Sequence, residues 1–303
     1  MTVPNSHPFF APQTLARLQG LPLRARRIVE GYVAGLHRSP FRGHSIEFAE
    51  HREYAAGDDL KHVDWKVFAR TDKFYVKQFE DETNLICYLT VDTSASMLYR
   101  GPSSPLSKLE YAQCLAASLA WLVLHQQDAV ALATFDSELR DSLSPSNSAA
   151  HWPHVLRVLE SVRPAHRTQA GKILHELAEK FRKRGVVVVV SDLLDDVGSL
   201  AAGLKHLRHQ RHDVVVFHVL DAAELDFPFP RPLRFCGLES DDRIVVDPVP
   251  LRRMYLRELR NHLAAVRACC LERSIDYRLV RTDQPLDEAL AALLLSRSRW
   301  GGG

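Results

Sequence analysis

The stretch Leu85-Ile86-Cys87-Tyr88-Leu89-Thr90-Val91-Asp92-Thr93-Ser94-Ala95-Ser96 decides the fold that we predict for this chain. It is an apolar run, rich in β-branched residues, that stops abruptly at an acid and three hydroxyl residues. Such a run is typical of a strand buried on both faces, as in a parallel sheet covered by helices. In open α/β sheets, ligands bind outside the carboxyl ends of the strands. The stretch therefore predicts a central strand with a candidate site at its end.

The polar residues at this strand end follow a regular spacing. Asp92, Ser94 and Ser96 alternate at i, i+2 and i+4, so an extended loop can direct all three side chains into one space. Oxygen-only ligands suit a hard cation such as Mg²⁺ or Mn²⁺. We therefore predict that these three residues bind a divalent cation.

The rest of the chain alternates strand and helix patterns. Further apolar runs predict strands at residues 129–135, 186–190, 214–220 and 275–280, with a short strand at 244–246. A capping box at Ser107 opens an apolar helix to about His125. Another helix is predicted after Thr168 and before Gly185, and further helices at residues 200–207, 251–271 and 286–295. This alternation predicts an α/β fold, with a three-layer, doubly wound and mainly parallel sheet.

Composition bounds the class of protein. The 303 residues are 46% hydrophobic and 25% charged, and the formal net charge is +2, so we expect no nucleic-acid binding. Five cysteines without a CxxC pair fit reduced thiols in a cytosolic protein. The N-terminus lacks a signal-peptide pattern, and the longest uncharged run is too polar to span a membrane. We expect a cytoplasmic protein without membrane insertion.

The first part of the chain has a different character. Residues 15–36 look helical, and residues 37–82 interleave both charge signs with aromatics, without a long apolar run. A weak alternation at residues 73–79 suggests a strand, and the balanced charges indicate a salt-bridged surface. We predict a smaller α+β segment at residues 1–84 and a main domain at residues 85–303.

A second strand ends like the first one. The valine-rich run at residues 186–190 leads into Ser191-Asp192, and Thr168 lies at a loop-to-helix junction between the two strands. If the strands are parallel neighbours, Asp192 and Asp92 converge at one edge of the sheet. Neutral hydroxyls donate little electron density to a cation, so the cation keeps most of its positive charge. Because Mg²⁺ takes about six ligands, such a site can accept an added carboxylate from a partner.

Taken together, these residues resemble the metal-ion-dependent adhesion site of von Willebrand factor A domains. The resemblance rests on Asp92-x-Ser94-x-Ser96, Thr168 and Asp192, in chain order. It implies that the two serines and the threonine bind the cation directly, that the two aspartates act through water or close by, and that a partner's acid completes the shell. The His166-Arg167 pair before Thr168 departs from the glycines of many such domains.

The N-terminal part resembles a bacterial family, the domain of unknown function 58. The resemblance is carried by HRSPFRGHSIEFAEHREYAAGDDLKHVDWKVFARTDKFYVKQFEDE, by VDTSASM and by DAAELDFPF, and it covers residues 28–280. It implies a bacterial protein encoded beside a MoxR-type AAA+ ATPase. The expected partner is that ATPase or its client, in the assembly or maturation of client proteins.

Simpler structural roles remain open for the site residues. Asp92, Ser94 and Ser96 suit a strand-end turn, Thr168 suits a helix N-cap, and Asp192 could cap the helix that follows it. A metal-dependent phosphohydrolase of the haloacid dehalogenase type is the alternative function. It needs a second acid two residues after the nucleophile, where this chain has Ser94. We therefore favour a non-enzymatic interaction module.

Overall fold

The computed structural model describes residues 12–36, 51–53, 75–77, 85–239, 242–286 and 290. The chain forms two units, Leu36–Asn84 and a larger unit made of Met1–Gly35 with Leu85–Gly303. In the smaller unit, β1 (His51–Glu53) pairs antiparallel with β2 (Tyr75–Lys77), which lies within the strand suggested at residues 73–79. The remaining mixed-charge positions of residues 37–82 lie outside the described residues.

The first two helices belong to the larger unit, whereas the sequence analysis placed them in the segment 1–84. Helices α1 (Pro12–Ala16) and α2 (Leu21–Leu36) bury Leu15, Ala25 and Ile28 in its core. These apolar side chains explain why the unit boundary falls near Gly35 as well as at Leu85.

A six-stranded sheet forms the centre of the larger unit. Its strands are β3 (Ile86–Asp92), β4 (Ala129–Phe135), β5 (Leu139–Ser146), β6 (Val186–Ser191), β7 (Asp213–Leu220) and β10 (Asp276–Arg281). The order is β10-β7-β6-β3-β4-β5, and only β5 runs antiparallel to its neighbour. The predicted mainly parallel sheet is confirmed. Strand β5 was not predicted, because its sequence LRDSLSPS has no apolar run.

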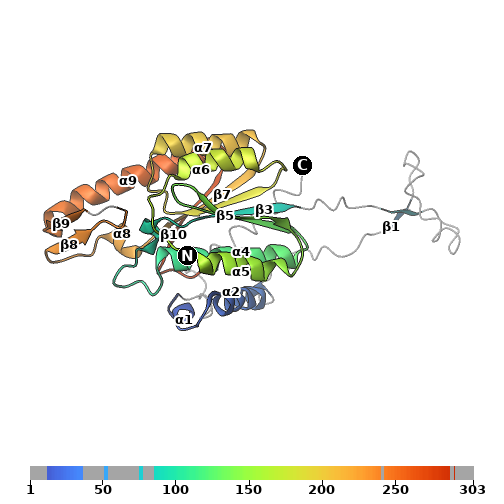
Figure 1. Ribbon diagram of the computed structural model, residues 1–303, viewed down its shortest axis with the longest axis horizontal. Helices are drawn as coiled ribbons and strands as arrows, with labels where there is room; N and C mark the ends of the chain where they lie inside the picture. Colours follow the sequence, from blue (N-terminus) through green and yellow to red (C-terminus); the bar gives the residue numbers. More distant parts are fainter. Residues whose placement is uncertain are drawn as a thin grey trace. The chain divides into compact units, whose positions relative to one another are not determined.

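Helices cover both faces of this sheet (Figure 1). On one face lie α4 (Lys108–His125) and α5 (His151–Ser161), with α2 packed outside them. On the other face lie α6 (Ala170–Lys180), α7 (Val197–His209) and α9 (Pro248–Glu272). The predicted three-layer arrangement is confirmed. Most of the predicted closing helix at residues 286–295 lies outside the described residues.

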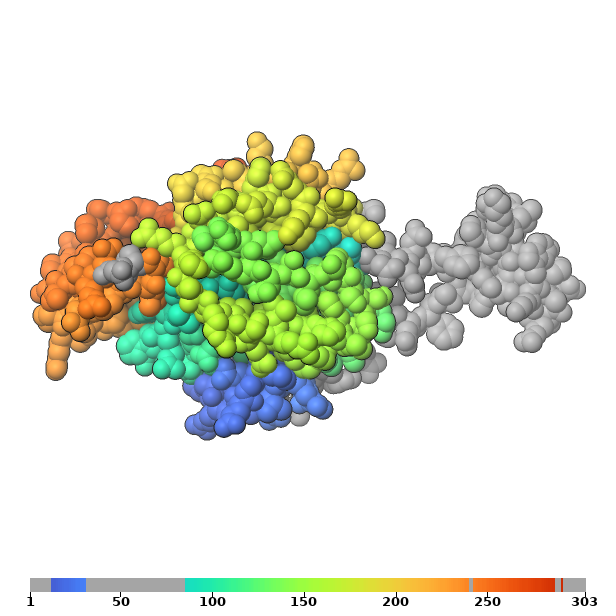
Figure 2. Space-filling model, in the orientation of Figure 1, coloured from blue at the N-terminus to red at the C-terminus, as the bar shows by residue number. Residues whose placement is uncertain are grey.

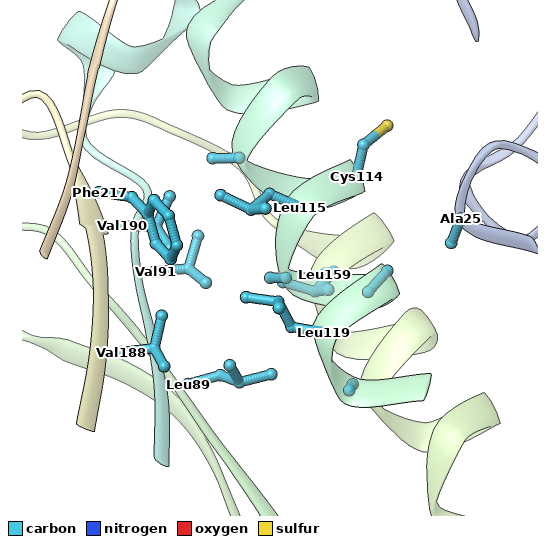
Figure 3. Packing of buried hydrophobic residues seen from close by; sticks show 14 of the residues in the cluster. Ala25, Leu89, Val91, Cys114, Leu115, Leu119, Leu159, Val188, Val190 and Phe217 are labelled. Carbon is cyan, nitrogen blue, oxygen red and sulfur yellow. The ribbon is translucent and has the colours of Figure 1, made fainter. Parts of the chain in front are cut away.

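The valine strand supplies side chains to both layers, as its unbroken apolar run predicts. Val188 and Val190 face α4, where they pack beside Leu115 and Leu119 (Figure 3). Their neighbours on the opposite face belong to the second core under α6 and α7. Full burial of each such side chain stabilises the fold by about 1.5–3 kcal/mol. The two cores therefore fix the position of the strand ends that follow them.

The predicted capping box at the start of α4 is present. Ser107 Oγ accepts a hydrogen bond of 3.1 Å from Glu110 N, and Glu110 Oε2 accepts one of 2.9 Å from Ser107 N. These two reciprocal hydrogen bonds fix where the helix begins. Lys108 is therefore the first helical residue, at the carboxyl end of the sheet.

A small extension connects β7 with α9. It consists of α8 (Ala222–Asp226) and a two-stranded hairpin of β8 (Leu233–Cys236) and β9 (Arg243–Val246). Rings of Phe227, Phe229, Phe235 and Tyr255 pack together beneath the hairpin. The short strand predicted at 244–246 is β9, and β8 was not predicted. No helix in the described part of the chain has the length and apolar character needed to cross a membrane.

Candidate functional site

The end of β3 places Asp92 at the bottom of a tight polar loop. Asp92 Oδ1 accepts a hydrogen bond of 2.9 Å from Ser94 N, which holds the loop against the strand end. The chain then enters a short 3-10 helix, Ala95–Leu98. Across this turn, Ser94 Oγ and Ser96 Oγ lie 3.1 Å apart. The i, i+2, i+4 spacing therefore brings the three side chains into one small volume.

Thr168 joins this cluster from a distant loop. Its Oγ1 donates a 3.0 Å hydrogen bond to Asp92 Oδ2, which also accepts one of 2.5 Å from Ser191 Oγ. The loop is held in place because Ala95 N donates to His166 O at 2.9 Å. The N-cap residue of α6 is Gln169, so the Thr168 hydroxyl faces the cluster instead of capping the helix.

Asp192 reaches the cluster from β6, which pairs directly with β3. A hydrogen bond from Ser96 to its carboxylate links the two strand ends. The Asp192 carboxylate also accepts a 3.3 Å hydrogen bond from the backbone N–H of Leu194. Asp192 does not cap the helix that follows it, because the N-cap residue of α7 is Asp196. All five predicted residues therefore meet at the carboxyl edge of the sheet.

Two further charged residues, which the sequence analysis missed, complete the surroundings of Asp192. Lys108 Nζ donates to Asp192 Oδ2 at 2.8 Å and to Glu224 Oε1 at 2.7 Å, with the lysine side chain fully buried. A signal was present in the sequence. A lysine in the first turn of a capped helix opposes the helix dipole, so its placement needs nearby acids.

The two aspartates differ in their electrostatics. Burial, followed by the charge of Asp192, raises the pKa of Asp92 to about 7. Burial also opposes ionisation of Asp192, but the Lys108 ammonium and its hydrogen bond hold the pKa of that carboxyl below its usual value. Burial raises the pKa of Glu224, although Lys108 also donates to this carboxylate. Within the described ranges Asp92 forms no ion pair, so of these three acids it is the one without a cation beside it.

The arrangement fits a hard divalent cation. Neighbouring ligands of an octahedral Mg²⁺ with bonds of about 2.1 Å lie about 3 Å apart. The hydroxyls of Ser94 and Ser96 are 3.1 Å apart, which agrees with two neighbouring ligands, and the hydroxyl of Thr168 is held beside them by its hydrogen bond to Asp92. The donors are all oxygens and Asp92 is an uncompensated buried acid, so charge and ligand type agree with Mg²⁺ or Mn²⁺.

Other acids near this edge have structural roles. Asp196 is the N-cap residue of α7, and its Oδ2 accepts a 2.7 Å hydrogen bond from Ser199 N. Asp195 Oδ2 accepts a 3.0 Å hydrogen bond from Gly171 N at the start of α6. Within the described ranges, no group of three or more His, Cys, Asp or Glu side chains could hold a metal ion. A metal site here depends on hydroxyl ligands.

The hairpin touches the same edge through its tip. Arg167 Nε donates to Glu239 O at 3.1 Å, and Thr168 N donates to Glu239 Oε1 at 3.3 Å. The β8–β9 connection therefore lies against the loop that carries Thr168. Local sequence patterns do not indicate this contact, because residues 167 and 239 are far apart in the chain.

Comparison with known proteins places the chain in a sequence family. The profile of the family described as "Protein of unknown function DUF58" matches residues 50–265, which confirms the resemblance inferred from the sequence. The uncharacterized protein Rv1480 of Mycobacterium tuberculosis is 25% identical over 295 residues, or 95% of this chain and 91% of that protein.

Solved structures with a similar arrangement are more distant. BatB from Bacteroides thetaiotaomicron is 15% identical with a TM-score of 0.43, over 70% of this chain and 98% of that one. An aerotolerance-related membrane protein from Bacteroides fragilis is 17% identical with a TM-score of 0.46, over 70% and 99%. The SpRpn10 VWA domain is 13% identical with a TM-score of 0.37, over 68% and 93%.

Proposed function

We propose, given that the chain belongs to the family described as "Protein of unknown function DUF58", that it is a non-enzymatic protein-interaction module. Its site binds Mg²⁺ or Mn²⁺ at the carboxyl ends of β3 and β6 and recognises a carboxylate of a partner protein. The observation that carries the proposal is the convergence of hydroxyl and carboxylate oxygens from three separate segments on Asp92.

Each residue has a distinct part in this proposal. Ser94, Ser96 and Thr168 offer neutral oxygens to the cation, and Asp92 orients Ser94 and Thr168 through its hydrogen bonds. Asp192 holds Ser96 while Lys108 offsets its charge. When bound, the cation supplies the positive charge that a partner's carboxylate needs at this edge. Because the protein offers few charged ligands, that charge is only partly neutralised.

Metal binding is tested by calorimetric titration of EDTA-treated, dialysed protein with MgCl₂ or MnCl₂. We expect saturable binding to the wild type and its loss in Ser94→Ala and Asp92→Asn. Ser142→Ala on β5 is the matched control, because this exposed serine lies on a different strand. Absence of binding to the folded wild type contradicts the proposal.

The proposed partner is a MoxR-type AAA+ ATPase or its client, as the family resemblance implies. The test measures binding of the purified ATPase from the same genome to immobilised wild type, Ser94→Ala and Ser142→Ala proteins. The serine variants are decisive, because EDTA would also remove Mg²⁺ from the ATPase nucleotide. Equal capture by the wild type and Ser94→Ala contradicts a metal-dependent contact.

A further inference from the structure

The two faces of the β8–β9 hairpin have different surroundings. Phe235 stacks on Phe227 with ring centroids 6.0 Å apart, so the face of the hairpin that carries Phe235 and its register partner Ile244 is the inner face. Alternation along a strand then places Arg234, Val245 and their neighbours Cys236 and Arg243 on the opposite, outer face. We call these last four residues the outer face of the hairpin.

The outer face is basic, apolar and open. All four of its side chains are exposed, and Val245 is 75% exposed. Among the described residues, Arg234 and Arg243 form no ion pair. Arginine next to exposed aliphatic surface is a composition typical of protein interfaces. The surface therefore favours a ligand that carries both carboxylates and apolar groups.

The edge of β9 indicates that the ligand is an extended segment. In the described part of the chain, the hairpin has only two strands, so the far edge of β9 has no strand beside it. A two-stranded sheet is marginally stable in water, and an added strand satisfies its unpaired backbone groups. Ile244, which is 58% exposed although it lies on the inner face, would gain cover from such a strand.

The hairpin also contacts the loop that carries Thr168 of the candidate metal site. Its tip residue Glu239 contacts the backbone of Thr168 and the side chain of Arg167, as described above. In Figure 2, the hairpin belongs to the orange part of the surface of the larger unit. A single extended segment can therefore lie on the hairpin and continue toward the carboxyl edge of the sheet.

We propose that the edge of β9 and the outer face of the hairpin bind an extended partner segment in which acidic and apolar residues alternate. The acidic side chains lie on the outer face, pair with Arg243 and Arg234, and cover Val245 with their aliphatic stems. The apolar side chains lie on the inner face beside Ile244. The proposal rests on the proposed function only in that this segment belongs to the partner of the metal site.

The structure offers a direct probe of this surface. Cys236 is exposed, whereas the other four cysteines, Cys87, Cys114, Cys269 and Cys270, are buried. The rate at which Cys236 reacts with a thiol reagent therefore reports access to the outer face. The ligand is an acetylated eight-residue peptide of alternating Glu and Val, and a Lys–Val peptide of the same pattern is the charge control.

We expect the Glu–Val peptide to slow the Cys236 reaction at least fivefold and saturably, and the Lys–Val peptide to have no effect. Arg243→Glu is expected to weaken this protection at least tenfold, with each variant compared with and without peptide. Arg278→Glu, an exposed arginine on β10, is the matched control and keeps the protection. Urea unfolding establishes that both variants are folded.

Three results overturn this inference: no protection by the Glu–Val peptide, equal protection by both peptides, or unchanged protection in Arg243→Glu. The assay is run in EDTA and in MgCl₂, which separates it from the proposed function. Protection in EDTA by a protein that binds no Mg²⁺ supports docking on the hairpin and contradicts the metal site. Mg²⁺ binding without protection of Cys236 supports the metal site and contradicts docking on the hairpin.

Discussion

The two ends of the central sheet differ in the kind of side chain that they bury. At the carboxyl end, Asp92, Asp192 and Lys108 are all charged or titratable groups with no solvent exposure. At the amino end, Tyr88 and Phe181 stack with ring centroids 4.0 Å apart, and the ring of His212 packs edge-on against Tyr88. The carboxyl end therefore buries a cluster of charged groups, whereas the amino end buries a stacked aromatic cluster, with partly exposed ion pairs such as that of Asp213 with Arg208 near it.

This difference indicates which end of the sheet contributes less to the free energy of unfolding. Burying a charge is costly unless it is paired, and even a paired charge stabilises little compared with an apolar core. At the amino end, Tyr88 Oη donates to Lys183 O at 3.0 Å and a His212 ring nitrogen bonds Phe181 O at 3.1 Å, whereas His212 Nδ1 has no hydrogen-bond partner among the described residues. An end that retains buried charges at a cost in stability is the expected place for a binding site.

The largest test of this comparison removes the buried cation. Lys108→Met leaves Asp192 and Glu224 without their partner, so we expect the free energy of unfolding to fall by about 3–5 kcal/mol. Urea denaturation measures the change. Lys172→Met, an exposed lysine 3.9 Å from Glu176, is the matched control and should change stability by less than about 0.5 kcal/mol. A loss below about 1 kcal/mol for Lys108→Met would show that the buried acids do not depend on the lysine for their stability.

The second prediction concerns the uncompensated acid at the same end. A cation that binds only the folded protein stabilises it by about 2.7 kcal/mol at a free concentration of one hundred times its Kd. We expect MgCl₂ to stabilise the wild type in this way and to have no such effect on Asp92→Asn. Urea denaturation with and without MgCl₂ measures both, and Asp141→Asn, an exposed acid on β5, is the control. Equal stabilisation of Asp92→Asn would contradict a site at Asp92.

The contrast between the two ends also explains what the sequence could predict. Apolar runs such as the one from Val186 to Val190 specify buried parallel strands, and Asp92 and Asp192 stand out because they end such runs. The alternation of patterns then orders the layers. Strand β5 could not be found in this way, because an edge strand with exposed, polar residues lacks the apolar signal.

The missed parts of the site depend on contacts between distant segments. Lys108 was visible only as the residue after a cap, and its pairing with Glu224 is set by how α4 and α8 meet at the sheet edge. Glu239 lies in a connection between two short strands, and nothing in its local sequence indicates contact with Thr168. Local patterns specify elements and strand ends, whereas side-chain partners across the edge require the packed structure.

The third prediction tests the neutrality of the amino end. Burial lowers the pKa of His212, so the folded protein keeps this histidine neutral while the unfolded chain takes up a proton below about pH 6.5. Its contribution therefore destabilises the fold as pH falls, by at most about 1.4 kcal/mol per pH unit. Urea denaturation at pH 7.5, 6.5 and 5.5 should give a shallower pH dependence for His212→Phe than for the wild type. Identical slopes for the two proteins would mean that folding does not lower the pKa of His212.

The smallest effect concerns one hydrogen bond at the amino end. Tyr88→Phe keeps the stacked ring and removes the hydroxyl that donates to Lys183 O, so we expect a loss of about 0.5–1.5 kcal/mol in urea denaturation. Because this end carries no ligand, the stabilisation by MgCl₂ should be the same in Tyr88→Phe as in the wild type. A reduced response to MgCl₂ would mean that the two ends of β3 are coupled. That result would remove the distinction between a stable end and a binding end, since β3 would then transmit packing changes at Tyr88 to Asp92.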